Sequence, residues 1–92
     1  MKEIEIAESL VFAIRKLPKE DRRHIGELIS ETQRIFGQSH AHRGTGLRDL
    51  GRKHYEVRLS ISARLLFENR KDVLYFKMMG NHNDIKRYLK NI

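Results

Sequence analysis

Four consecutive segments decide the fold: YEVRLS (55–60), ISARLLFE (61–68), NRKDVLYFKMMG (69–80) and NHNDIKRY (81–88). The first two alternate between apolar and polar residues, as strands do when one face is buried. The third is almost wholly apolar over residues 73–79, which is typical of a central strand covered on both faces. Because the links between these strands are short, we predict an antiparallel meander followed by a polar segment that carries a histidine.

The residues before this stretch predict one strand and two helices. Residues 2–6 alternate like a short half-buried strand. Apolar residues at helical spacing predict helices over 7–16 and 19–36, separated by Pro18, with Gly37 as a C-terminal cap. Two helices with so short a link form an antiparallel hairpin, whose apolar faces need the sheet as a partner.

Two further segments complete the chain. Residues 38–51 (QSHAHRGTGLRDLG) resemble a loop, which is either a solvated connector or a functional segment. The last residues predict a short helix capped by Asn83 or Asp84. We therefore expect an α+β fold, in which an N-terminal strand and a helical hairpin pack on a small antiparallel sheet and a short C-terminal helix follows. Residues 1–92 are expected to form a single domain.

Composition limits the function classes. The chain has no cysteine, which excludes disulfides and cysteine-based zinc sites. It shows no secretory signal and no apolar run long enough for a membrane span, so we expect a cytoplasmic protein without a membrane partner. The net charge is +7, and residues 1–32 carry six basic and seven acidic side chains, so the excess lies after residue 32. Such segregation favours a polyanion or an acidic protein as partner.

Arg58 and Arg64 are the first candidates for chemistry. They lie on neighbouring predicted strands, and a hairpin between these strands could bring both to the same face. Two guanidinium groups on a rigid sheet can bind a phosphate through paired hydrogen bonds. The alternative is solvent-facing charge, which fits Arg64 less well because it stands in an otherwise apolar run.

His82, Asp84 and Tyr88 lie just beyond the last strand. An imidazole can accept or donate a proton at neutral pH, and Asp84 could orient it or simply cap the helix. Tyr88 could stack on a base or donate its hydroxyl to a phosphate, although its helical spacing from Ile85 and Ile92 is also typical of a core residue.

The other histidines raise the possibility of a metal site. His40 and His42 form a possible chelating pair, and His54 follows in the next segment. No carboxylate or cysteine accompanies them at ligand spacing, so we expect no metal.

Several ordered motifs together resemble the RelE/ParE superfamily of bacterial toxins. The link RKLPK (15–19), the turn GLRDLG (46–51), the strand YEVRL (55–59), the segment RLLF (64–67) and GNHNDIKRY (80–88) follow the order and spacing of that family. The resemblance spans nearly the whole chain.

The resemblance implies a function. RelE-type members are toxins of type II toxin–antitoxin pairs that cleave messenger RNA at the ribosome without a cofactor or metal. By position, Arg58 and Arg64 correspond to basic catalytic residues, His82 to a general acid or base, and Tyr88 to a tyrosine that stacks on a base. Arg48, Arg52, Lys53 and His54 are expected to contact RNA. The implied partners are an acidic antitoxin, the ribosome and messenger RNA.

The sequence also departs from that pattern and leaves other functions open. Glu56 stands where ribosome-dependent members often have a second lysine. ParE-type members share the fold, lack the nuclease residues and inhibit DNA gyrase, although His82 and Tyr88 together favour the nuclease branch. The third alternative is a non-catalytic module that binds RNA or protein, for which we expect salt-sensitive binding without cleavage.

Overall fold

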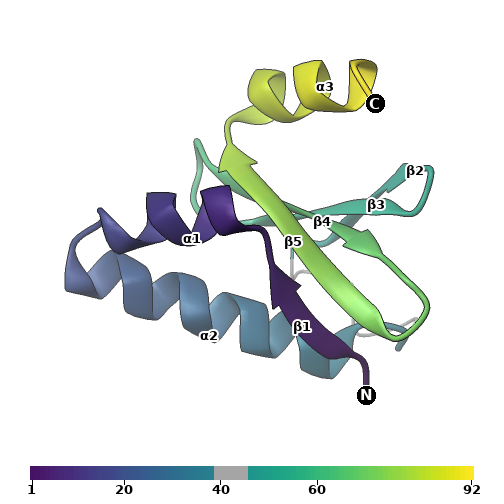
Figure 1. Ribbon diagram of the computed structural model, residues 1–92, viewed down its shortest axis with the longest axis horizontal. Helices are drawn as coiled ribbons and strands as arrows, with labels where there is room; N and C mark the ends of the chain where they lie inside the picture. Colours follow the sequence, from purple (N-terminus) through teal and green to yellow (C-terminus); the bar gives the residue numbers. More distant parts are fainter. Residues whose placement is uncertain (39–45) are drawn as a thin grey trace.

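The computed structural model describes residues 1–38 and 46–92, and it shows three helices and five strands within them (Figure 1). In chain order these are β1 (Glu3–Ile6), α1 (Glu8–Arg15), α2 (Lys19–Ile35), β2 (Arg48–Gly51), β3 (His54–Arg58), β4 (Arg64–Asn69), β5 (Val73–Gly80) and α3 (His82–Lys90).

The five strands form one sheet in the order β1-β5-β4-β3-β2. Strands β2 to β5 are antiparallel neighbours, as the short links predicted, whereas β1 pairs with β5 in parallel. The sheet is therefore mixed rather than antiparallel throughout. The parallel pairing is possible because the helical hairpin carries the chain away from β1, so no tight turn fixes the direction of this strand.

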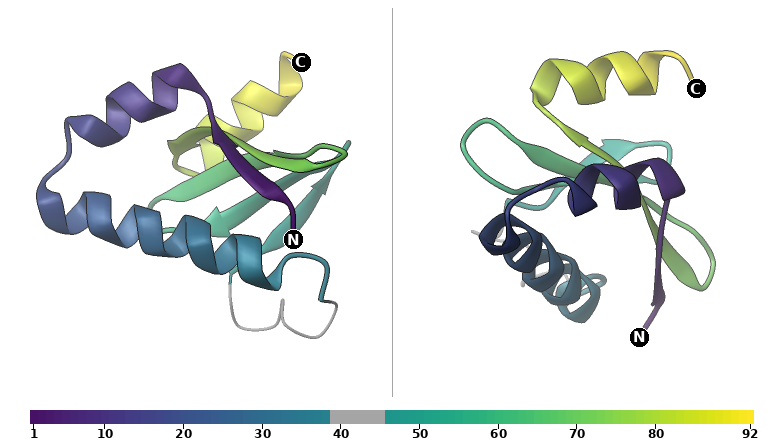
Figure 2. Two further views of the ribbon diagram at one scale, coloured as in Figure 1. Left: turned by 60° about the horizontal axis from the view of Figure 1, so that its bottom comes forward. Right: turned by 60° about the vertical axis from the view of Figure 1, so that its left-hand side comes forward.

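The α+β architecture is that expected from the sequence, with the sheet between helices (Figure 2). Helices α1 and α2 cover one face, where Leu10, Ile25 and Ile29 pack with buried residues of the sheet: Val57, Leu65, Phe67, Leu74 and Phe76. Helix α3 lies across the other face, and both α1 and α3 contact β5. This double cover explains why β5 reads as an almost continuous apolar run.

The sequence predicted a loop over residues 38–51, but the structure shows strand β2 over its last four residues. Arg48 pairs with Glu56 and Asp49 with Tyr55, but the register shifts before Gly51 reaches His54. The shift interrupts the two-residue alternation by which strands are recognised. The remainder of the expected loop, residues 39–45, lies outside the described residues, and the possible metal pair His40 and His42 lies there too.

Helix α3 begins earlier than the sequence suggested. Its N-terminal cap is Asn81, not Asn83 or Asp84. The Asn81 side chain accepts a hydrogen bond from the Asp84 amide at 2.8 Å, and the Asp84 carboxylate accepts one from the Asn81 amide at 2.9 Å. Gly80 permits this cap, because a Cβ there would lie 2.8 Å from the Asp84 Cβ. Asp84 is thus engaged in the cap rather than in orienting His82.

Candidate functional site

The sheet face opposite α1 and α2 is polar, and we call it the polar face. Directly opposed residues of antiparallel strands share a face, and Arg58 is opposed to Arg64 as His54 is to Glu68. The polar face therefore carries the following side chains of β3 and β4: His54, Glu56, Arg58, Arg64, Leu66 and Glu68. The predicted convergence of Arg58 and Arg64 on one face is present.

Glu56 lies between two arginines on this face. Its carboxylate is buried, with 2% of the side chain exposed, and Arg64 Nε lies 2.8 Å from Oε2. Arg48 Nη1 lies 3.9 Å from Oε1. Neither contact has the alignment of a hydrogen bond, and among the described residues no other group donates one to either oxygen. The three side chains form an ion-paired cluster with one surplus positive charge.

His82 and Tyr88 reach the polar face from α3. The exposed His82 is the first residue of the helix and lines an open cavity of about 310 Å³. The other residues around this cavity come from β2, β3 and α3: Arg48, Leu50, Glu56, Ile85, Lys86 and Leu89. Tyr88 is half-buried, and Lys77 Nζ lies 5.7 Å from the centroid of its ring, within the range of a cation–π contact. The structure thus places His82 and the carboxylate that pairs with Arg64 around one cavity.

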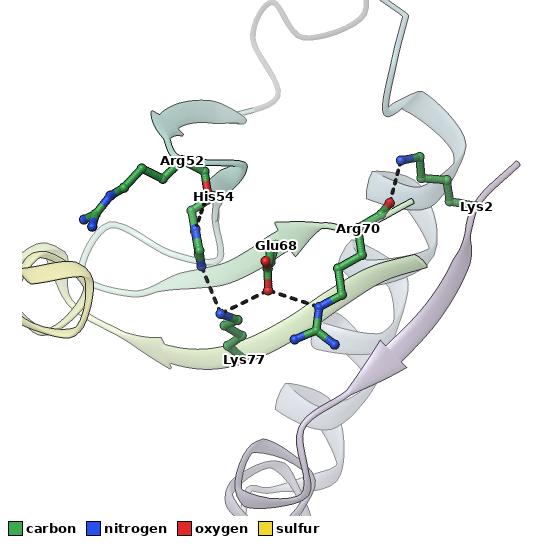
Figure 3. Close-up of polar contacts among 6 residues, drawn as sticks. All are labelled: Lys2, Arg52, His54, Glu68, Arg70 and Lys77. Atoms are coloured by element: carbon green, nitrogen blue, oxygen red, sulfur yellow. Dashed lines mark hydrogen bonds and ion pairs between the residues drawn. The ribbon is translucent and has the colours of Figure 1, made fainter. Parts of the chain in front are cut away.

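His54 belongs to a polar network inside the protein (Figure 3). Its Nδ1 lies 2.8 Å from the Arg52 carbonyl, and its Nε2 lies 3.0 Å from Lys77 Nζ. The carbonyl can only accept and the ammonium can only donate, so these two contacts require the tautomer of His54 that carries its proton on Nδ1. The ring is 4% exposed and has both nitrogens engaged, which argues against the direct RNA contact expected of it.

Lys77 and Arg70 continue the network to Glu68, at 3.2 Å and 3.1 Å from Oε1. Burial opposes ionisation of this carboxylate, but the hydrogen bonds and charges of Lys77 and Arg70 together hold the pKa of Glu68 below its ordinary value.

Arg52 and Lys53 form the two-residue turn between β2 and β3. Both have positive φ, 52° and 65° respectively. The Arg52 side chain points away from His54 (Figure 3) and donates a hydrogen bond to the Leu89 carbonyl of α3 at 2.7 Å. Arg48, Arg52 and Lys53 are all exposed. Of the four residues expected to contact RNA, three therefore lie at the surface, on β2 and its turn.

No protein-family model matches the sequence, and no curated protein matches it significantly. Solved structures do match. A chain of the RelE–RelB complex from Pyrococcus horikoshii OT3 has a TM-score of 0.65 at 16% identity, over 87% of this chain and 93% of that chain. The isolated RelE toxin of E. coli has a TM-score of 0.64 at 16% identity, over 100% of both chains. The YoeB dimer from Staphylococcus aureus has a TM-score of 0.64 at 17% identity, over 88% and 97%.

The chain has the fold of the RelE/ParE toxins. The order and spacing of the sequence motifs, from RKLPK (15–19) to GNHNDIKRY (80–88), predict the same fold. Two residues of the polar network, Lys77 and Glu68, are not among the site residues predicted from the sequence. The sequence contains a signal for Lys77, because a lysine within the apolar run VLYFKMM implies a partner for its charge. Glu56 was noticed only as a departure from the family, and nothing in its alternating strand indicated burial.

Over residues 1–38 and 46–92, no three His, Asp or Glu side chains cluster as metal ligands would. In the same residues, no helix has the length and apolar character needed to span a membrane.

Proposed function

We propose that this chain is the toxin of a type II toxin–antitoxin pair and that it cleaves messenger RNA on the ribosome. Its fold is shared with RelE and YoeB toxins, some of which were solved with the antitoxins RelB and YefM. The observation that carries the proposal is the direct opposition of Arg58 and Arg64 on the polar face, with His82 and Tyr88 on the helix that lies across it.

These residues suit cleavage by the RNA's own 2′-hydroxyl. The hydroxyl loses its proton and its oxygen attacks the adjacent phosphorus, while the bond from phosphorus to the 5′-oxygen breaks. The products are a 2′,3′-cyclic phosphate and a 5′-hydroxyl. Arg58 and Arg64 would stabilise the charge that accumulates on the phosphate oxygens in the transition state.

His82 would handle a proton in this step. It is exposed at the start of α3 and lines the cavity that Arg48 and Glu56 also line, so a phosphodiester bound there would lie near its ring. Either the imidazolium would protonate the departing 5′-oxygen while water accepts the 2′-proton, or the neutral imidazole would accept the 2′-proton while water protonates the 5′-oxygen. Tyr88 would stack on a neighbouring base.

An acidic antitoxin is the proposed protein partner. The net charge of +7 favours an acidic chain that covers the polar face and neutralises its arginines. A helix laid on this face or a strand added to the sheet would be a suitable mode of binding.

Induced expression tests the function. Wild type, Arg58→Ala with His82→Ala, and a control Arg22→Ala on the exposed side of α2 are compared for growth arrest and for new 5′ ends in cellular mRNA. We expect arrest with cuts at fixed positions within codons for wild type and the control, and neither for the double variant. Arg64→Ala is avoided because it would leave Glu56 buried without its partner. Arrest with intact mRNA would favour a gyrase inhibitor instead, and no arrest would favour a non-catalytic binding module.

A further inference from the structure

Glu56 raises a physical question that the proposed cleavage leaves open. A buried carboxylate whose oxygens accept no aligned hydrogen bond is unfavourable, unless nearby positive charge compensates. Both oxygens of Glu56 are in this position, and the compensation comes only from Arg64 and Arg48 among the described residues. The carboxylate is therefore best explained by what it does to these two arginines.

The sheet register determines which arginines Glu56 meets. Arg48 of β2 is directly opposed to Glu56, and Arg64 of β4 is its diagonal neighbour, since Glu56 is opposed to Leu66. Side chains at both kinds of position are within reach of one another on one face of a sheet. One carboxylate on the middle strand can thus hold a guanidinium from each side.

The contact with Arg64 involves the inner nitrogen of the guanidinium. Nε lies 2.8 Å from Glu56 Oε2, so the terminal Nη1 and Nη2 groups are left for another anion. This terminal fork matches the spacing of two phosphate oxygens. Arg64 is 20% exposed, whereas Arg48 is 66% exposed, so one arginine is fixed and the other remains movable.

We propose that Glu56 is a positioning residue, which fixes Arg64 and draws Arg48 toward it so that the two form a clamp for an RNA phosphate. This inference rests on the proposed function and extends it to a residue at which the sequence departs from the RelE pattern. Glu56 acts through the arginines and not on the RNA, because its oxygens are buried and face them.

The catalytic arm of the test uses purified protein, programmed ribosomes and the variants Glu56→Gln, Arg64→Lys and both together. Glutamine keeps the size of the side chain and removes the charge, and lysine keeps the charge and removes the fork. We expect Glu56→Gln to lower kcat about tenfold or more, since small displacements of a catalytic group are costly. In the Arg64→Lys background, Glu56→Gln should lower kcat little further. The pH profile of kcat in Glu56→Gln should keep its wild-type shape.

A matched control is Glu68→Gln, which also removes a carboxylate of the polar face paired with two cations. Its effect should add to that of Arg64→Lys, because Glu68 does not contact Arg64. Full additivity of Glu56→Gln with Arg64→Lys would overturn the inference, as would a wild-type rate per folded molecule. Loss of the acidic limb of the pH profile in Glu56→Gln would also overturn it, because the carboxylate would then itself carry the proton.

A second arm does not depend on cleavage and separates the inference from the proposed function. The side-chain Nε–H signal of Arg64 is observed by NMR and assigned through its absence in Arg64→Lys. The negative charge of Glu56 beside Nε disfavours removal of the proton by hydroxide, so we expect slow hydrogen exchange in wild type and in Glu68→Gln, and faster exchange in Glu56→Gln. If wild type does not cut mRNA, the function is wrong, and this signal still decides whether Glu56 fixes Arg64. Equal exchange in wild type and Glu56→Gln would overturn the inference.

Discussion

At the residue scale, the Glu56–Arg64 pair should contribute strongly to stability. Arg64→Ala leaves a buried carboxylate beside a single exposed arginine, and breaking a buried pair in this way costs about 3–5 kcal/mol. We expect a loss of that order in urea unfolding. Adding Glu56→Gln to Arg64→Ala should recover part of it, since no unpaired charge remains buried. The exposed Arg58→Ala is the control and should change stability by less than about 0.5 kcal/mol. Equal effects of Arg64→Ala and Arg58→Ala would contradict the structural role.

The second prediction at the residue scale concerns how Glu68 makes the unfolding free energy depend on pH. Its pKa in the folded protein is lowered by Lys77 and Arg70 against the opposing effect of burial. A lowered pKa means that the unfolded chain takes up the proton first as the pH falls. The stabilisation is therefore complete above the unfolded value, about 4.3, and is lost as the pH decreases through the folded value. Glu68→Gln should flatten the decline of the unfolding free energy in this acidic range. An unchanged slope between pH 6 and 3 would contradict the prediction.

Individual residues differ in how far the sequence reveals them. Arg64 was identifiable because a charge within an apolar run requires a partner, and the structure supplies Glu56. His54 was expected to contact RNA, and the structure buries its ring. The sequence does not indicate this burial, because alternation says which residues share a face and not what covers that face. The cover comes from contacts distant in sequence, such as that of His54 with Lys77.

At the scale of elements, the turn between β2 and β3 should be strained. Arg52 and Lys53 both have positive φ, which a two-residue hairpin of type I′ requires and which non-glycine residues adopt at a cost. Lys53→Gly should therefore raise the unfolding free energy by about 0.5–1 kcal/mol, after allowance for the freer unfolded chain. Lys71→Gly in the turn between β4 and β5 is the control, because Lys71 does not have positive φ and glycine should be neutral or destabilising there. Thermal unfolding of both variants measures their change in stability. A destabilised Lys53→Gly would contradict the assignment of strain to this turn.

Elements with regular periodicity were predictable, and those whose start depends on local exceptions were not. The apolar spacing of α1 and α2 and the alternation of β3 and β4 predicted bounds within about three residues. Strand β2 was missed because its register shift removes the alternation. The start of α3 was misplaced because Asn81, Asn83 and Asp84 are all good caps, and only the fit of Asp84 against Gly80 selects Asn81.

At the scale of the whole molecule, the segregation of charge along the chain becomes a segregation in space. Residues 1–32, which carry no excess of positive charge, form β1, α1 and most of α2, and the two helices cover one face of the sheet. The excess positive charge follows in the segments that build β2 to β5 and α3. A polyanion is therefore expected to approach the polar face, opposite the helical hairpin.

Salt dependence tests this direction of approach. Binding of single-stranded RNA releases counterions, so the logarithm of the binding constant should fall linearly with the logarithm of salt concentration, by about 0.7 for each phosphate contact. Arg58→Ala removes one contact on the polar face and should make this slope shallower by about 0.7. Arg22→Ala removes the same charge from α2 and should leave the slope unchanged, although net charge falls equally in both variants. Equal slopes in the two variants would mean that RNA binding depends only on the total charge of the protein. The polar face would then not be the RNA-binding surface.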